Sequence, residues 1–213
     1  MQKKEKMIII IVAIVVVALI VLGVILANKS NKVTSNTKAE TKVSTLYNKI
    51  KNTDTYSFNF TADDNSKVFY AKSGEKAYMD TKYNGSETKY IIKDGNSYLI
   101  KDSDKRYYTY TNNNIDLDLV SETLADLINL EHNDGKEDID GKSYNYEEYS
   151  VLTNIAISDF SNETNIKTRL YFKGKDLVYI KTISDRKQEL LKVDMSTKVE
   201  NNLFEIPSDY VEG

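Results

Sequence analysis

The sequence predicts an α+β protein in which an N-terminal transmembrane helix is followed by a curved antiparallel sheet, with helices covering the concave side of the sheet. Three observations lead to this fold class. Residues 7–27 form an uninterrupted apolar run. Turn residues recur about every ten positions between 56 and 111, as in all-β ladders. Two stretches, 39–52 and 115–130, carry apolar residues at the spacing of one helix face.

The apolar run reads MIIIIVAIVVVALIVLGVILA and contains no charged residue. At about 1.5 Å rise per residue, a helix of this length spans roughly the 30 Å hydrocarbon core of a bilayer. Lysines lie among residues 1–6, and most of the chain follows the run. We therefore expect a single-pass signal anchor in the cell membrane, with residues 1–6 cytoplasmic and the rest extracytoplasmic. A long signal peptide that is cleaved near Ala27 is the alternative.

The anchor is followed by a polar, aperiodic linker at 28–38 and then by one domain, 39–213. The formal net charge of the chain is −3, and residues 1–42 contribute +5, so residues 43–213 carry −8. An acidic domain lacks the basic patch that nucleic acid requires, and we expect no such partner. The absence of cysteine excludes disulfides, thiolate metal sites, a cysteine nucleophile and a lipid-modified cysteine.

The first helix presents a single apolar stripe, and Thr37 or Asn36 can cap its start. The second helix has a wider apolar stripe, and Asn114 or Asp116 can cap it. The stripe of the first helix consists of Ala39, Val43, Leu46, Tyr47 and Ile50, and that of the second of Leu117, Val120, Leu124, Leu127 and Ile128.

The meander between the two helices has six predicted strands. Its turns are rich in Asp, Asn, Gly and Ser, which tolerate the backbone angles of tight reversals. The predicted strands are YSFNFTA (56–62), KVFYAK (67–72), KAYMDTKY (76–83), TKYIIK (88–93), SYLIK (97–101) and RYYTYT (106–111).

The segment KYIIKDGNSYLIKDSDKRYYTY, 89–110, has apolar or aromatic residues on both faces of its strands, whereas a half-buried strand alternates. The register depends on the turn. A three-residue loop at 94–96 places Tyr90, Ile92, Tyr98 and Ile100 on one face and Ile91 and Leu99 on the other. A two-residue loop shifts the partners, and both faces still receive apolar side chains.

After the second helix we expect a polar, acidic connection, EHNDGKEDIDG, at 131–141. Strands follow it, and a hairpin turn is expected at 174–176. The predicted strands are KSYNYEEYSV (142–151), TNIAISDF (153–160), KTRLYFKG (167–174), DLVYIKTI (176–183), QELLKVDM (188–195) and LFEIPSDY (203–210).

Several of these stretches, namely 90–110, 138–150, 169–183 and the ending LFEIPSDYVEG, resemble the LolA-like superfamily. That group includes the outer-membrane lipoprotein carrier, mycobacterial lipid-carrying lipoproteins of the LppX type and membrane-anchored proteins of Gram-positive bacteria. The resemblance covers roughly residues 39–213. It implies an incomplete β-barrel of about ten or eleven strands with helices in its open side. It also implies a hydrophobic cavity that binds lipid or lipoprotein acyl chains.

The sequence offers little material for catalysis. His132 is the only histidine, and we expect it to be solvated in the polar connection. There is no G-x-S-x-G motif, P-loop or dinucleotide fingerprint, and 133–141 lacks the spacing of a calcium loop. Glu147 and Glu148 are interpreted as a solubilising pair on an edge strand. We expect no enzyme activity, no cofactor and no metal.

These observations predict a non-catalytic binding module for a lipid, a lipoprotein acyl chain or another apolar ligand, held between the sheet and its helices. The alternative is a structural or regulatory envelope protein whose core is filled and which docks another membrane or envelope protein. The candidate ligand-binding residues are Phe58, Phe60, Tyr90, Ile92, Tyr98, Leu99, Ile100, Tyr108, Leu124, Leu127 and Ile128.

Overall fold

The computed structural model describes residues 40–83, 85–111, 117, 119–150, 160, 163 and 165–213. The predicted cytoplasmic segment, anchor and linker (1–38) lie outside this part, as do the four expected cap residues of the helices. Of the strand expected at 153–160, only Phe160 is described. No helix in the described part is long and apolar enough to cross a membrane.

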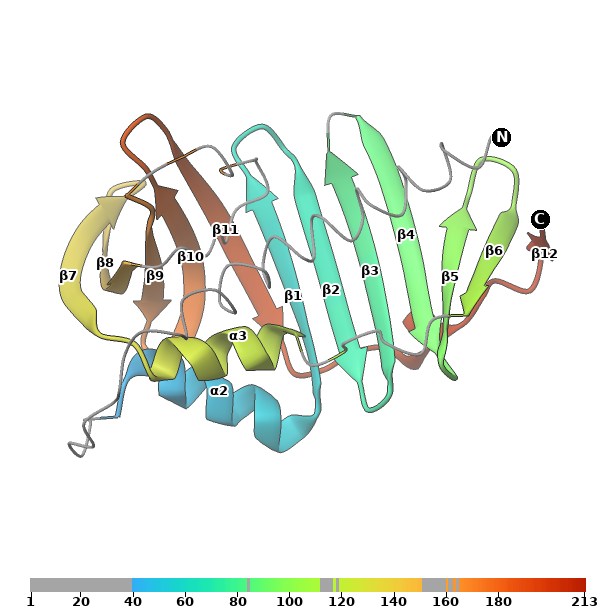
Figure 1. Cartoon of the computed structure of the whole chain (residues 1–213), viewed down its shortest axis with the longest axis horizontal. Helices are drawn as coiled ribbons and strands as arrows, with labels where there is room; N and C mark the ends of the chain where they lie inside the picture. The colour runs from blue at the N-terminus through green and yellow to red at the C-terminus, as the bar shows by residue number, and fades with distance from the viewer. Residues whose placement is uncertain are drawn as a thin grey trace.

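The strands form one curved, twelve-stranded sheet in the order β12-β6-β5-β4-β3-β2-β1-β11-β10-β9-β8-β7 (Figure 1). All neighbours are antiparallel except β12 and β6. The described sheet is open, since it ends at β12 on one side and β7 on the other, as expected for an incomplete barrel. The strands are β1 (Thr55–Ala62), β2 (Lys67–Ser73), β3 (Lys76–Tyr83), β4 (Ser86–Lys93), β5 (Asn96–Lys101), β6 (Arg106–Thr111), β7 (His132–Ile139), β8 (Lys142–Ser150), β9 (Lys167–Lys173), β10 (Asp176–Ile183), β11 (Gln188–Ser196) and β12 (Val211–Glu212).

The sheet joins two halves of the chain. Strands β1 to β6 follow one another as a meander, confirming the six predicted strands, and β7 to β11 form a second run of neighbours. The two runs meet where β1 pairs with β11, with Phe58 opposite Met195. A pairing between residues that are far apart in the sequence therefore joins the two runs.

Helix α2 (Lys42–Thr53) precedes β1, and its start is fixed by a side-chain cap. The hydroxyl of Thr41 accepts a hydrogen bond of 2.9 Å from the backbone N–H of Ser44. Val43, Leu46 and Ile50 are fully buried, and burial of such a side chain contributes roughly 1.5–3 kcal/mol. The helix ends at Asp54, whose left-handed backbone (φ 45°) donates a hydrogen bond to the carbonyl of Ile50.

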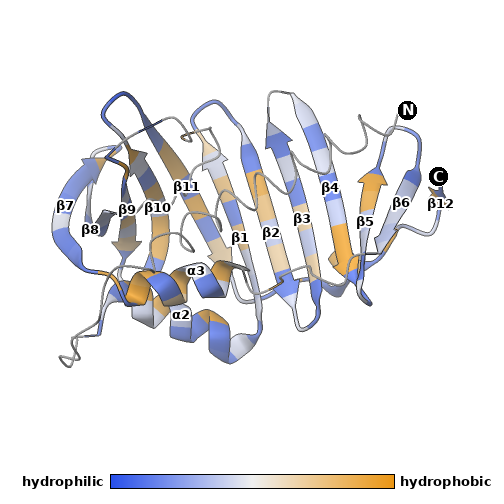
Figure 2. Ribbon diagram, in the orientation of Figure 1, coloured by the Kyte–Doolittle hydropathy of each residue, from blue (hydrophilic) through white to orange (hydrophobic). Residues whose placement is uncertain are grey.

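Helix α3 (Leu119–Ile128) lies between β6 and β7 and packs on α2. It is shorter than the predicted stretch 115–130. Both helices lie against the same face of the sheet, here called the helix face (Figure 1). Figure 2 shows hydrophobic residues along both helices, and Val43, Leu46, Ile50, Leu124 and Leu127 join the hydrophobic core. We call the opposite side the outer face.

A C-terminal segment covers part of the outer face. It contains a short 3-10 helix, η1 (Asn201–Phe204), which contacts β3 and β4, and its Phe204 is 1% exposed. Glu205 forms ion pairs of 3.5 Å with Lys76 and 2.6 Å with Lys93, two residues that the register places on the outer face. Both faces of the meander carry apolar residues, and the helices cover part of one face while this segment covers part of the other.

Two predicted elements were wrong. The acidic stretch 131–141 is an edge strand, β7, because pairing with β8 stabilises it despite its polar residues. The closing strand expected at 203–210 is replaced by η1 and a turn, and only Val211–Glu212 pair with β6. Phe204 still anchors this segment, as its apolar character suggested.

Candidate ligand-binding face

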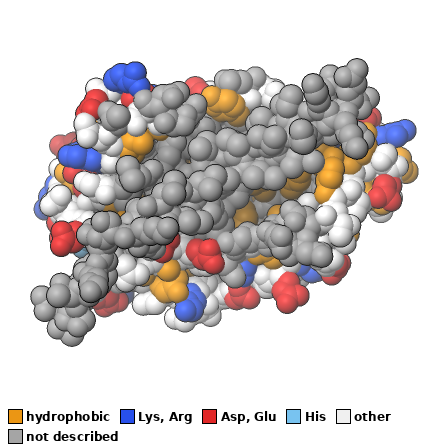
Figure 3. Space-filling model, viewed as in Figure 1, with side chains coloured by type: hydrophobic (Ala, Val, Ile, Leu, Met, Phe, Trp, Pro, Cys, Tyr) orange, Lys and Arg blue, Asp and Glu red, His pale blue; other side chains and the backbone are white. Residues whose placement is uncertain are grey.

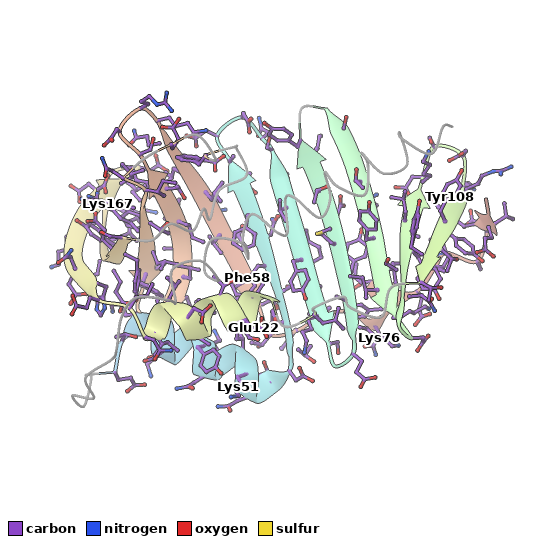
Figure 4. The ribbon with its side chains drawn as sticks, in the orientation of Figure 1. Lys51, Phe58, Lys76, Tyr108, Glu122 and Lys167 are labelled. Carbon is purple, nitrogen blue, oxygen red and sulfur yellow. The ribbon has the colours of Figure 1, made fainter. Side chains whose placement is uncertain are left out.

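The strand register defines which side chains share the helix face of the meander. Residues directly opposite in antiparallel neighbours point to the same side. A row of six such residues crosses β1 to β6: Phe58, Tyr70, Met79, Tyr90, Leu99 and Tyr108. Phe58 and Tyr108 mark its two ends in Figure 4. We call these six residues the central row.

The helices cover only one end of this row. One hydrophobic cluster joins the two helices to β1, β2 and β8 to β11, and includes Phe58, Leu124 and Leu127. A second cluster consists of Met79, Tyr90 and Leu99, with Tyr70, Tyr108 and Tyr110 packed against it. No helical residue of the described part belongs to this second cluster. Figure 3 shows hydrophobic side chains at the surface of this side of the molecule, toward its β5 end.

Tyr70 connects the two clusters. It packs against both, and its ring lies 6.2 Å from that of Tyr56. Its hydroxyl donates a hydrogen bond of 2.8 Å to the carbonyl oxygen of Leu117, just before α3. The approach to α3 is thus tied to the boundary between the two clusters.

Nine of the eleven predicted residues belong to this side of the sheet or to the helix that packs on it. They are Phe58, Phe60, Tyr90, Ile92, Leu99 and Tyr108 on the strands, and Leu124, Leu127 and Ile128 on α3. Tyr98 and Ile100 lie on the outer face. Lys93 pairs directly with Asn96, so the loop has two residues, Asp94 and Gly95, both with positive φ. The alternative with a three-residue loop was wrong.

Sequence reasoning missed Tyr70, Met79 and Tyr110. Only the register aligns them with Tyr90 and Leu99. Two-residue turns at 74–75, 84–85 and 94–95 and a four-residue turn at 102–105 set this register and would have placed them.

The hydroxyl groups within the second cluster lie in apolar surroundings. Burial, together with the nearby Tyr110, raises the pKa of Tyr90 to about 12. Burial, then Tyr108, raises the pKa of Tyr110. The hydroxyl of Tyr90 is buried and has no hydrogen-bond partner in the described part of the chain. These hydroxyl groups remain protonated at neutral pH and can donate a hydrogen bond.

A second group of polar residues lies near α2 and has the composition of a metal site. His132, Asp134 and Glu147 bring one ligand atom each to within 4.8 Å of one another. Glu147, however, accepts hydrogen bonds from the backbone N–H groups of Lys42 (2.6 Å) and Val43 (3.3 Å). The N-terminus of a helix is the positive end of its dipole, which disfavours a cation. Glu147 therefore serves as a cap of α2.

This arrangement corrects two interpretations. Glu147 and Glu148 are 2% and 8% exposed on an interior strand, so they are no solubilising edge pair. Glu148 instead binds Arg169 at 2.6 Å. His132 lies on a strand, with its side chain 18% exposed and its ring 5.4 Å from that of Tyr149, rather than in a solvated connection.

A polar hollow of about 400 Å³ lies elsewhere, at the β1–β2 turn beside β10 and β11. Its lining mixes acidic, basic and amide groups, and Lys181 within it is paired with Glu137 at 2.7 Å. Such a lining does not match an apolar ligand.

Comparisons with known proteins gave structural neighbours alone. No protein-family model and no curated protein matches the chain. Among solved structures, it is similar to LprF from Mycobacterium bovis (11% identity, TM-score 0.45, 82% of this chain and 100% of that one). An uncharacterised conserved protein from Thermus thermophilus gives 9% identity and a TM-score of 0.45, over 79% and 96% of the two chains. A LolA superfamily protein from Nitrosomonas europaea gives 9% and 0.28, over 80% and 98%.

Proposed function

We propose that this protein is a membrane-anchored, extracytoplasmic binding module for a lipid, a lipoprotein acyl chain or another apolar ligand, and that it performs no catalysis. One observation carries the proposal. The central row continues over β3 to β6, past the end of the helix-covered cluster, with apolar and tyrosine side chains.

The dimensions of this surface suit an acyl chain. Four strand spacings separate β2 from β6, which amounts to about 19 Å. The rings of Tyr70, Tyr90 and Tyr108 supply broad apolar area. A surface of this kind binds a flexible hydrocarbon without demanding directional contacts.

Photocrosslinking tests the proposal. The full chain is reconstituted in phosphatidylcholine nanodiscs with trace amounts of an acyl lipid that carries a diazirine, supplied as a monoacylglycerol or as a fatty acid. We expect saturable labelling that peptide mass spectrometry locates in β3 to β6. Labelling that rises linearly with probe, or that spreads over the outer face, would overturn the proposal.

Two neighbouring tyrosines supply a matched pair of variants. Tyr108 and Tyr107 are both half-buried on β6, but Tyr108 faces the helix side and Tyr107 the outer side. Tyr108→Ala should reduce the saturable labelling several-fold, whereas Tyr107→Ala should leave it unchanged. Equal effects of the two variants count against the proposal. One dominant protein partner with an empty lipid extract would favour the docking role instead.

A further inference from the structure

The charges on the helix face of the meander are all of one sign. The register places three basic residues on this side of β1 to β6, namely Lys72, Lys101 and Arg106, and no carboxylate on any of the six strands. The domain as a whole carries −8 over residues 43–213. The charged strand residues beside the central row are therefore basic, although the domain is acidic.

Lys72 is already neutralised. Its side chain is 6% exposed and forms an ion pair with Asp54, at the C-terminus of α2. It therefore holds the helix to the sheet and is not the available cation.

Lys101 and Arg106 are different. They lie directly opposite each other on β5 and β6, where like charges destabilise a strand pair. Lys101 lies 5.4 Å from the centre of the Tyr108 ring, and the described part of the chain offers neither basic residue a carboxylate partner. In the adjoining turn, Asp102 binds Lys89 on the outer face at 2.5 Å.

Several basic residues of the outer face are balanced by carboxylates, although Lys67 and Lys82, which lie opposite each other there, have none in the described part. Lys89 binds both Glu87 and Asp102, and Lys93 binds Glu205. Lys101 and Arg106 lie beside the central row without such a carboxylate. Two adjacent positive charges of this kind complement an anionic group of a ligand.

The second, independent observation is Tyr90. It is 8% exposed, it belongs to the central row, and its buried hydroxyl has no hydrogen-bond partner in the described part of the chain. A buried donor without an acceptor costs about 1–3 kcal/mol. An oxygen atom of a ligand lying on this row would supply the acceptor.

We propose that the ligand is an anionic amphiphile, whose acyl chain lies along the central row and whose phosphate or carboxylate is bound by Lys101 and Arg106. An ester or head-group oxygen accepts the hydrogen bond of Tyr90. This inference rests on the proposed function, and it adds the class of ligand.

The test compares two lipids that differ by one phosphate group. Full chain in phosphatidylcholine nanodiscs is labelled with a diazirine monoacylglycerol or with its phosphorylated form, lysophosphatidic acid, at equal mole fraction. We expect about tenfold stronger saturable labelling by the phosphate lipid, because it forms charge-assisted hydrogen bonds that the neutral lipid cannot form. Equal labelling by the two lipids overturns the inference and leaves the proposed function standing, whereas saturable labelling by neither rejects the proposed function itself. A diazirine fatty acid distinguishes carboxylate from phosphate as the preferred anion.

Variants separate the two contacts. Lys101→Gln with Arg106→Gln should abolish the preference for the phosphate lipid and spare labelling by the neutral one. Tyr90→Phe should weaken labelling by both lipids about threefold, since both retain the ester. Lys82→Gln and Tyr98→Phe are controls on the outer face and should change neither. Retained selectivity in the double variant, or an equal effect of Lys82→Gln, contradicts the assignment.

Discussion

The carboxylate of Glu147 on β8 accepts a hydrogen bond of 2.6 Å from the backbone N–H of Lys42, the first residue of α2. Its other oxygen accepts from Val43 at 3.3 Å and from the hydroxyl of Tyr149 at 2.8 Å. Burial, together with the carboxylate, raises the pKa of Tyr149, which keeps that hydroxyl protonated as a donor. A residue of the second half of the sheet thus caps the helix that begins the domain.

Removing this cap should loosen α2. We expect Glu147→Ala to lower the free energy of unfolding by about 2–3 kcal/mol, because two helix N–H groups lose their acceptor. Thr41→Ala, which removes the local cap, should cost about 1 kcal/mol. Chemical unfolding measures both, and hydrogen exchange should accelerate in α2 first. Unchanged exchange in Glu147→Ala would show that the carboxylate is dispensable.

Glu137 on β7 should make stability depend on pH. Burial opposes its ionisation, but hydrogen bonds from Lys181, Tyr171 and Arg169 prevail and lower the pKa of Glu137 from 4.5 to about 2. Between these values the folded state binds fewer protons than the unfolded state, so the stabilisation present above pH 4.5 is lost as the pH falls toward 2.

Glu137→Gln tests that linkage. It should lower the free energy of unfolding at pH 7 by about 1–2 kcal/mol. This is less than the free energy that corresponds to the whole pKa shift, because solvent screens these charges. It should also flatten the pH dependence between pH 2 and 4.5. Asp138→Asn, at the exposed neighbouring position, serves as control. Parallel pH curves for Glu137→Gln and the unmodified protein would refute the linkage.

The meander could be predicted because each of its strands is bounded by local turn chemistry. Asp94 and Gly95 both adopt positive φ, which their residue types favour, and the strands between the turns follow. The face assignment was harder. A difference of one residue in the length of this loop decides whether Leu99 or Ile100 joins Tyr90, and only the structure settled that register.

The other half of the fold depends on contacts between distant residues. Most residues of β7 are polar, so its own sequence does not distinguish it from a loop. Only its pairing with β8 identifies it as a strand. The pairing of β1 with β11 and the capping of α2 by Glu147 likewise join residues more than a hundred positions apart. The basic pair Lys101–Arg106 could be interpreted as an anion site only from the register, which shows that no carboxylate lies on its side of the six meander strands.

Phe204 should anchor the C-terminal segment to the outer face. Phe204→Ala removes a side chain that is 1% exposed, and we expect a loss of about 3–4 kcal/mol in the free energy of unfolding, against a smaller loss for Phe204→Leu. The backbone N–H groups of Val211 and Gly213 donate hydrogen bonds of 3.1 Å and 3.0 Å to the carbonyls of Lys105 and Tyr107, and they should exchange faster in Phe204→Ala. If they keep their protection while the protein is destabilised, the segment is held by β12 pairing instead.

Gly135 on β7 should tolerate no side chain, because a Cβ at this position would overlap the ring of Tyr146 on β8. That ring packs at 5.3 Å against Tyr171 and lies 4.6 Å from the guanidinium of Arg169, so it cannot move without disturbing these neighbours. We expect Gly135→Ala to cost about 1–3 kcal/mol in unfolding free energy, and Lys136→Ala, at the exposed next position, to cost little. In a Tyr146→Ala background the cost of Gly135→Ala should largely disappear, since the overlapping ring is gone. Additive effects of the two changes would place the strain elsewhere in β7.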